Sequence, residues 1–249
     1  NGNPKYLILY NGQPTATCTE NYVPIENEVL ENCAKRTLDN IGTEPKTWTI
    51  EIPKPYQWRF TSVLHEDFTV PIGHLRADDR FDWGFGLTNS YDLSMGINVM
   101  LYANRLICKN GMYSWKALDQ KRFIHIEKER DVTMILKKVE QGIFDTLEYA
   151  KDFFISLDEM SRRTPTTEQA LLVMKRLSIR KYESKLLEPQ GVTIEWNKAE
   201  MKNVRLKASM TEYDLLNTIS SLSNNVSLLH RAFELRTGIA GKIIEARTA

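Results

Sequence analysis

Aromatic residues alternate with lysines and arginines in two parts of this sequence, a mixture that suits the binding of single-stranded nucleic acid. Tyr56, Trp58 and Arg59 form the first part, and the second runs from Tyr91 to Arg122. Cations follow the phosphates of such a strand while its bases stack on aromatic rings. The residues that we expect to contact nucleic acid, single-stranded DNA above all, are Arg59, Asn89, Tyr91, Arg105, Lys109, Lys116, Lys121 and Arg122.

Structural roles compete with this interpretation at several of these positions. Trp58 alternates with Arg59, so Trp58 belongs to the apolar face of a strand and Arg59 points to the other face, where contact with a ligand is open to it. The cluster from Asn89 to Asp92 suits a turn in which side chains bond to the backbone, and a functional loop is equally open. Arg105 either contacts a ligand or pairs with Asp92 as a structural lock.

Motifs for catalysis and for cofactor binding are missing from the sequence. Neither GxxxxGK[ST] nor GxGxxG nor GxSxG occurs, so we expect no nucleotide cofactor and, on balance, no enzyme. The histidines are scattered without HExxH or HxH spacing, and we expect no metal. A metal-dependent nuclease is the weakest hypothesis: it requires Asp78, Asp79, Asp82 and Asp92 to converge on one cation, whereas a solvated loop is the simpler interpretation.

Composition places further limits on the function. The formal net charge of +1 over 249 residues gives no global attraction to nucleic acid, so binding must depend on local patches. Cys18, Cys33 and Cys108 are odd in number and lack CxxC spacing, which fits a reducing cytoplasm better than a disulfide framework. No apolar run approaches the roughly 18 residues of a membrane span, and no signal peptide is visible. We therefore expect a cytoplasmic protein.

The first half of the chain has mostly the pattern of strands. Asn11-Gly12 predicts a hairpin between residues 5–10 and 15–19, and residues 24–41 have the pattern of a helix. Period-2 alternation over 46–88 predicts a β-meander with one buried face. Gly84 and Gly86 share the opposite face, which indicates a bulge or a close approach of a backbone or ligand.

An apolar run from Met95 to Tyr102 follows between two turn clusters. Its length and surroundings predict a buried strand, and a helix over 94–106 is the main alternative, because periodicity alone does not separate the two. Residues 123–126 alternate again and predict a last short strand.

The second half is helical in pattern. Apolar residues at spacings of three and four predict a long helix over 130–162, and Thr164-Pro165 starts a second helix with a basic end. Residues 192–207 look irregular and basic. A last helix begins at Thr211, and its apolar residues over 215–233 form a seam suited to another helix or to a sister subunit, which predicts a homo-oligomer.

These elements define an α+β fold with an N-terminal helix, an antiparallel β-meander and long C-terminal helices. We expect a sheet domain over 1–129 and a helical region over 130–249, packed on the sheet domain or on a sister subunit.

Four segments of this chain resemble the phage/plasmid-like proteins of the domain-of-unknown-function 932 family. They are Tyr22–Asn27, Thr88–Ser94, Arg105–Asn110 and Thr211–Asn217. The chain departs from the family pattern at Leu93, where the family usually has glycine. The resemblance implies an origin in a mobile element and carries no settled biochemistry.

Two main hypotheses follow. The first is a nucleic-acid-binding protein of a phage or plasmid, such as a single-strand DNA annealing or recombination accessory. The alternative is a non-enzymatic protein-interaction factor of a mobile element, which acts in anti-defence or replication control. A basic stripe in the structure favours the first, and an apolar patch without basic lining favours the second.

Overall fold

The computed structural model describes residues 5–20, 22–64, 70–71, 80–105, 110–114, 122–123, 131–226, 231–232, 235 and 239–247. For residues 5, 70–71, 80, 105, 110–114 and 122–123 the description covers the backbone alone. The chain forms two compact units. Unit 1 comprises residues 1–68, 83–102 and 118–149, and unit 2 comprises residues 69–82, 103–117 and 150–249. The predicted ranges 1–129 and 130–249 have different boundaries and stay a prediction.

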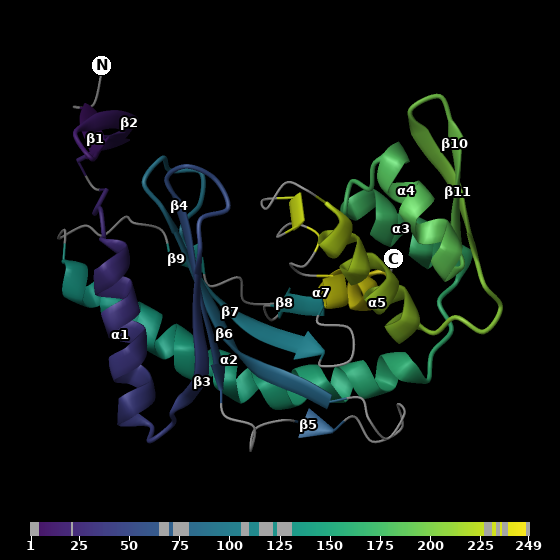
Figure 1. The fold of residues 1–249 in the computed structure, drawn as a ribbon, viewed down its shortest axis with the longest axis horizontal. Coiled ribbons are helices and arrows are strands. Elements are labelled where there is room, and N and C mark those ends of the chain that lie inside the picture. The colour runs from purple at the N-terminus through teal and green to yellow at the C-terminus, as the bar shows by residue number, and fades with distance from the viewer. Residues whose placement is uncertain are drawn as a thin grey trace. The chain divides into compact units, whose positions relative to one another are not determined.

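The fold is α+β, as predicted, with antiparallel strands and long helices in the second half of the chain (Figure 1). The main sheet has the strand order β3-β4-β6-β7-β8, with β5 beside β6 and β9 beside β7. Its strands are β3 (Pro45–Glu51), β4 (Gln57–Leu64), β5 (Val70–Pro71), β6 (Arg80–Ser90), β7 (Ile97–Arg105), β8 (Asn110–Ser114) and β9 (Arg122–Phe123). The apolar run is therefore a strand, and the helical alternative over 94–106 is wrong.

The N-terminal hairpin of β1 (Lys5–Tyr10) and β2 (Gln13–Thr19) confirms the turn signal. Asn11 and Gly12 both have positive φ, at 50° and 76°. Two consecutive left-handed residues match the right-handed twist of the strands they join, which is why Asn-Gly is favoured there.

Helix α1 (Asn27–Asn40) starts three residues later than predicted. Its buried side includes Leu30, Ala34 and Leu38, at helical spacing. The Cys33 thiol donates to the Leu136 carbonyl, 3.7 Å away, so α1 packs against the first half of helix α2. Burial, with Glu140 nearby, raises the pKa of the Cys33 thiol, which agrees with a packing role.

The expectation of a single buried face is wrong for β4 and β6. Gln57, Arg59 and Thr61 are buried together with the apolar residues that alternate with them. The register between β4 and β6 runs without a shift, so the expected bulge at the two glycines is absent from this pair. Gly84 instead marks a close approach: a Cβ there would lie 2.0 Å from the Ser62 carbonyl oxygen.

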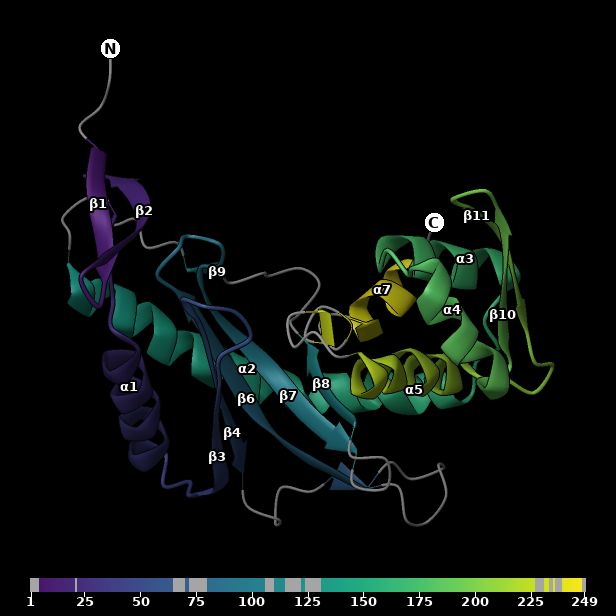
Figure 2. The same ribbon diagram turned by 45° about the horizontal axis from the view of Figure 1, so that its top comes forward.

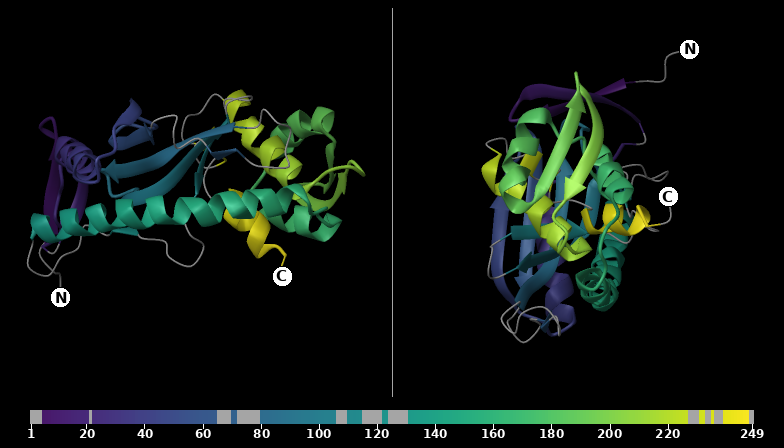
Figure 3. Two further views of the ribbon diagram at one scale, coloured as in Figure 1. Left: turned by 90° about the horizontal axis from the view of Figure 1, so that it is seen from below. Right: turned by 90° about the vertical axis from the view of Figure 1, so that its right-hand side faces the viewer.

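Helix α2 (Val132–Ser161) is one long continuous helix, within two residues of its predicted bounds (Figure 3). Helix α3 (Thr167–Arg176) begins after the cap Thr166 and not after Thr164. Thr166 accepts a bond from the Gln169 N–H at 3.1 Å, and the Gln169 side chain accepts one from the Thr166 N–H at 2.9 Å. This reciprocal capping box decides the helix start.

Residues 192–207 are not irregular, as was predicted, but form a hairpin. Strands β10 (Val192–Asn197) and β11 (Glu200–Leu206) pair antiparallel, and Val192, Ile194, Met201 and Val204 are buried. In unit 2 this hairpin packs against helix α4 (Lys181–Leu187), the 3-10 turn η2 (Glu188–Gln190) and α3 (Figure 2).

The predicted helical seam over 215–233 is interrupted. Helix α5 (Glu212–Leu222) passes into the 3-10 turn η3 (Ser223–Asn225), and Val226 is extended. Leu215, Ile219 and Leu222 are buried within unit 2, so they are not a free interface. Leu229 and Phe233 lie outside the described residues, helix α7 (Ile239–Glu245) closes the unit, and the homo-oligomer stays a prediction.

Across the described ranges, every helix is too short or too polar to cross a membrane.

Candidate nucleic-acid interface

Arg59 does not face solvent, contrary to the sequence-based expectation. Its side chain is 2% exposed and forms an ion pair with Glu51, which lies directly opposite it on β3. A guanidinium that is buried against a carboxylate is not available to a phosphate. Arg59 therefore stabilises the β3–β4 pair in this structure.

Asn89 lies at a junction between β6 and the start of α1. It is fully buried, and its Nδ2 donates to the Ile25 carbonyl at 3.0 Å and to Asn27 Oδ1 at 2.8 Å. Tyr91 adds a third bond, because its hydroxyl oxygen accepts from the Asn27 N–H at 3.1 Å. The first N–H groups of a helix lack partners in the helix itself. These contacts therefore favour the structural interpretation of Asn89 and Tyr91.

The turn after Tyr91 is also held by local bonds. Ser90 Oγ donates to the Met95 carbonyl at 2.8 Å and accepts from the Met95 N–H at 2.9 Å. Asp92 Oδ1 accepts from the N–H of Ser94 at 3.0 Å and from its hydroxyl at 2.5 Å. Leu93 has φ of 62°, in the left-handed region. The turn is thus an Asx type whose carboxylate already has partners.

Three tyrosines gather beside this turn. Tyr10 stacks on Tyr91 with centroids 5.0 Å apart and meets Tyr56 edge to face at 5.7 Å. Burial raises the pKa of Tyr91, against an opposing bond from Asn27, and Tyr10 and Glu26 raise it further. Burial also raises the pKa of Tyr22, as do Cys18, Tyr91 and Asp92. Both phenols are therefore neutral, and their burial in this cluster agrees with a packing role.

The remaining residues that we expect to contact nucleic acid are Arg105, Lys109, Lys116, Lys121 and Arg122. Arg105 and Arg122 are described by their backbone alone, in β7 and β9, so the pairing of Arg105 with Asp92 stays a prediction. Lys109, Lys116 and Lys121 lie outside the described residues. The structure therefore brings Asn89 and Tyr91 together and buries Arg59, and it leaves a cationic surface formed by the other five residues as a prediction.

Unit 2 carries a cationic surface that sequence reasoning described only as the basic end of a helix. On α4, Lys181, Tyr182, Lys185 and Leu186 are exposed while Glu183, Ser184 and Leu187 are buried. Positions i, i+1, i+4 and i+5 share one side of a helix. We call this side, with Arg180 just before it, the α4 face. In the sequence, the four-residue spacing of Lys181 and Lys185 indicates that they share one side of the helix.

The charge around the α4 face is strongly asymmetric. Residues 175–207 hold nine cationic and four acidic residues, a net charge of +5 in a chain whose total is +1. Three of the acidic residues, Glu183, Glu195 and Glu200, are paired with Arg231, Arg205 and Lys202, and the fourth, Glu188, is exposed. Within the described residues, Lys175, Arg180, Lys181 and Lys185 are exposed and form no ion pair.

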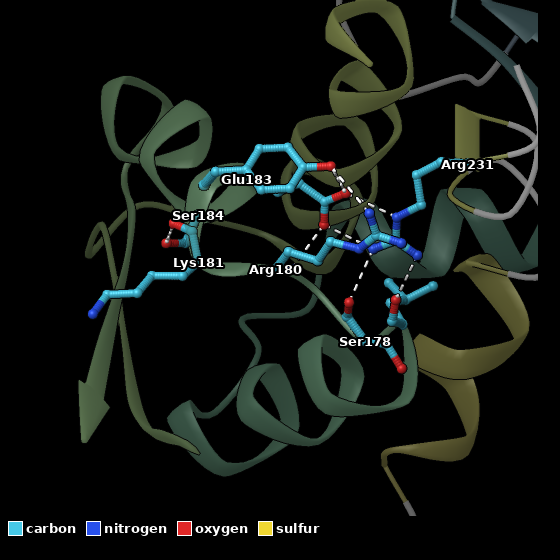
Figure 4. A network of polar contacts seen from close by, with 8 residues as sticks. Ser178, Arg180, Lys181, Glu183, Ser184 and Arg231 are labelled. Atoms are coloured by element: carbon cyan, nitrogen blue, oxygen red, sulfur yellow. Dashed lines mark hydrogen bonds and ion pairs between the residues drawn. The ribbon is translucent and has the colours of Figure 1, made fainter. Parts of the chain in front are cut away.

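A buried ion pair lies directly beneath the α4 face (Figure 4). Arg231 donates to Glu183 through Nε at 2.8 Å and Nη2 at 2.7 Å, and to the carbonyls of Leu177 and Ser178 at 3.2 and 3.0 Å. Burial alone would raise the pKa of Glu183, but bonds from Arg231 and the Arg180 N–H outweigh it and lower that pKa. Glu183 is thus an anion whose charge is neutralised by the buried Arg231.

The same pair orients the exposed aromatic residue. The Tyr182 hydroxyl donates to Glu183 Oε1 at 3.3 Å and accepts from Arg180 Nη1 at 3.5 Å. Its side chain nevertheless remains 52% exposed. A ring that is held at its hydroxyl and open along its side can offer a stacking surface next to free cations.

No set of three His, Cys, Asp or Glu residues in the described part of the chain could hold a metal ion. Asp82 and Asp92 belong to that part, whereas Asp78 and Asp79 lie outside it.

No protein-family model matches this chain, and neither a curated protein nor a solved structure matches it at a significant level. The resemblance to phage and plasmid proteins therefore stays a prediction.

Proposed function

We propose that this protein binds single-stranded nucleic acid through the α4 face, as a cytoplasmic accessory of DNA annealing or recombination in a phage or plasmid. The observation that carries the proposal is the combination of unpaired cations with the exposed ring of Tyr182. Lysine and arginine neutralise phosphates, and an aromatic ring accepts a base that is not already stacked in a duplex. The mobile-element part rests on the family resemblance alone.

The structure of the α4 face suits this role energetically. Its lysines lie on a helix that is anchored by a buried ion pair, so their backbone positions are fixed before binding. The three cations of the α4 face, Arg180, Lys181 and Lys185, each neutralising one phosphate, give a slope of log K against log salt of about −2 for a single strand. Binding should therefore weaken markedly between low and physiological salt.

The test is fluorescence anisotropy of labelled single-stranded and double-stranded DNA over a salt series. We expect a double variant, Lys181→Glu with Lys185→Glu, to lose most of the affinity. Tyr182→Ala should weaken single-strand binding by about 1–3 kcal/mol, with a smaller effect on the duplex. The matched control is Lys137→Glu with Lys151→Glu, because both lysines are exposed on α2; this variant should bind as the wild type does.

Two results would contradict the proposal. One is equal loss of binding in the α4 and α2 variants, which would indicate a non-specific effect of charge. The other is no binding at about 50 mM salt, where phosphate contacts are strong. That second outcome would favour the protein-interaction function instead.

A further inference from the structure

Strand β3 forms an open edge of the main sheet. It is at the end of the strand order, and in the described part of the chain it pairs with β4 alone. Most of its residues are exposed, from Lys46 to Ile50. The outward backbone N–H and C=O groups of such an edge strand can pair only with water or with another extended chain.

Apolar side chains line one face of this edge. Trp48, Ile50 and Ile52 are 36%, 52% and 63% exposed, and they recur at every second position. Ile50 lies directly opposite the buried Phe60, and the ring of Trp48 lies 4.8 Å from that of Phe60. The exposed row therefore continues the apolar face of the sheet onto its last strand.

Within the strand itself the usual protection of a sheet edge is limited to one end of β3, and from α1 the Lys35 ammonium lies 5.6 Å from the centre of the Trp48 ring. Pro45 and a register shift between Pro45 and Thr47 interrupt the start of the strand. From Thr47 onward the one charged residue of the strand is Glu51, whose carboxylate is paired with Arg59. Natural edge strands commonly carry lysines, prolines or bulges that prevent further pairing, and the segment 47–52 lacks them.

We propose that the β3 edge binds an extended segment of another protein, which adds one strand to the sheet and places apolar side chains beside Trp48, Ile50 and Ile52. Backbone bonds supply the affinity in this binding mode, and alternate side chains supply the specificity. The site is in unit 1 and is independent of nucleic-acid binding by the α4 face.

A second copy of this chain fits the edge less well. Seven residues of strand extend over roughly 23 Å, and two such edges side by side bury far less than the roughly 800 Å² per partner of a stable interface. A weak or transient contact with an extended segment does not need that area, and the segment brings both backbone partners and apolar side chains to the edge.

The test uses a labelled synthetic peptide of about nine residues, with valine alternating with threonine and a lysine at each end. We expect its anisotropy to rise with the concentration of the full chain, and its amide hydrogen exchange to show protection confined to residues 45–52. Ile50→Lys places a charge in the apolar row and should weaken binding about tenfold or more. Circular dichroism checks that this variant is folded.

Two controls distinguish pairing at the β3 edge from non-specific binding of the peptide to exposed apolar side chains. Leu7→Lys with Leu9→Lys changes another exposed apolar pair, on β1, and should leave peptide binding unchanged. A peptide with N-methyl groups at alternate residues keeps its side chains but loses its donors, and it should not bind.

Several outcomes would overturn the proposal. They are binding that survives N-methylation, equal affinity for the Ile50→Lys variant, and no binding up to about 1 mM peptide. Protection of 45–52 without peptide, together with a doubled mass in light scattering, would assign the edge to a second copy of this chain.

Discussion

Two polar networks, one in each unit, are of different kinds. In unit 1, neutral amide, phenol and hydroxyl groups join the sheet to α1, with Asn89 at the centre. In unit 2, the corresponding polar contacts are two ion pairs. Arg231 bonds with Glu183, and Arg247 bonds with Glu212 through Nε at 3.0 and 3.2 Å.

The difference shows what each kind of network requires. Every polar atom of the Glu183 carboxylate has a donor, because an unpaired buried charge costs several kcal/mol. Asn89 Oδ1, in contrast, is buried and accepts no hydrogen bond among the described residues. A neutral group tolerates such a deficit at a cost of about 1–3 kcal/mol. The Glu183 network should therefore be more sensitive to the loss of one partner than the Asn89 network.

Arg231→Ala should have the largest effect on stability. It leaves the Glu183 carboxylate buried with its main partner gone, which costs about 3–5 kcal/mol. Urea unfolding would measure the loss. The double variant Glu183→Gln with Arg231→Met should recover most of it, since removing both charges is often neutral.

An exposed ion pair of the same unit provides the matched control. Arg205 pairs with Glu195 and its side chain is 73% exposed, so Arg205→Ala should change stability little. Equal losses for Arg205→Ala and Arg231→Ala would contradict the distinction between buried and exposed charges.

Gly84→Ala should have the next largest effect, and it tests the sheet rather than a polar network. The added methyl group would lie 2.0 Å from a backbone oxygen that cannot rotate away. Overpacking of this kind costs about 3 kcal/mol at the upper end of its range. Gly241→Ala is the control, because nothing lies within 4 Å of its Cβ position, and thermal unfolding should show no loss. A neutral Gly84→Ala would mean that β4 and β6 can separate at this point.

Features that depend on neighbouring residues were predictable from the sequence, whereas features that depend on residues far apart in the chain were not. The periodicity of α2 and the Asn11-Gly12 turn are local signals, and both gave correct elements. The β10–β11 hairpin was missed because the buried Met201 and Val204 lie three positions apart on β11, where a register shift breaks the period-2 pattern. The burial of Arg59 depends on Glu51 across the sheet, a relation that spacing within one strand does not reveal.

The candidate site shows the same limit. The lysines that carry the α4 face lie four positions apart, so their shared side was readable from the sequence. The sequence does not show which nearby carboxylates are free to neutralise these lysines. Glu183 lies within the same helix, yet it is turned inward by Arg231, which is 48 positions further along the chain.

Asn89→Ala tests the neutral network of unit 1. It removes two hydrogen bonds and leaves the Ile25 carbonyl and Asn27 Oδ1 without their donor, which should cost about 2 kcal/mol in urea unfolding. Tyr91→Phe removes one acceptor and should cost about 1 kcal/mol. Asn225→Ala on the exposed surface of unit 2 should stay within about 0.5 kcal/mol of the wild type. A loss for Asn89→Ala that equals the loss for Arg231→Ala would remove the contrast between the two networks.

Leu93→Gly should have the smallest effect, and of the opposite sign. Leu93 has φ of 62°, where a Cβ costs about 1–2 kcal/mol, whereas glycine adopts this conformation freely. The greater entropy of glycine in the unfolded chain offsets about 0.5–1 kcal/mol of that gain. We therefore expect a net stabilisation of about 0.5 kcal/mol in unit 1, measured as a raised urea midpoint with an unchanged slope. Leu93→Ala keeps the Cβ and should not stabilise. If both variants stabilise equally, the gain comes from removing an exposed apolar side chain and not from the backbone.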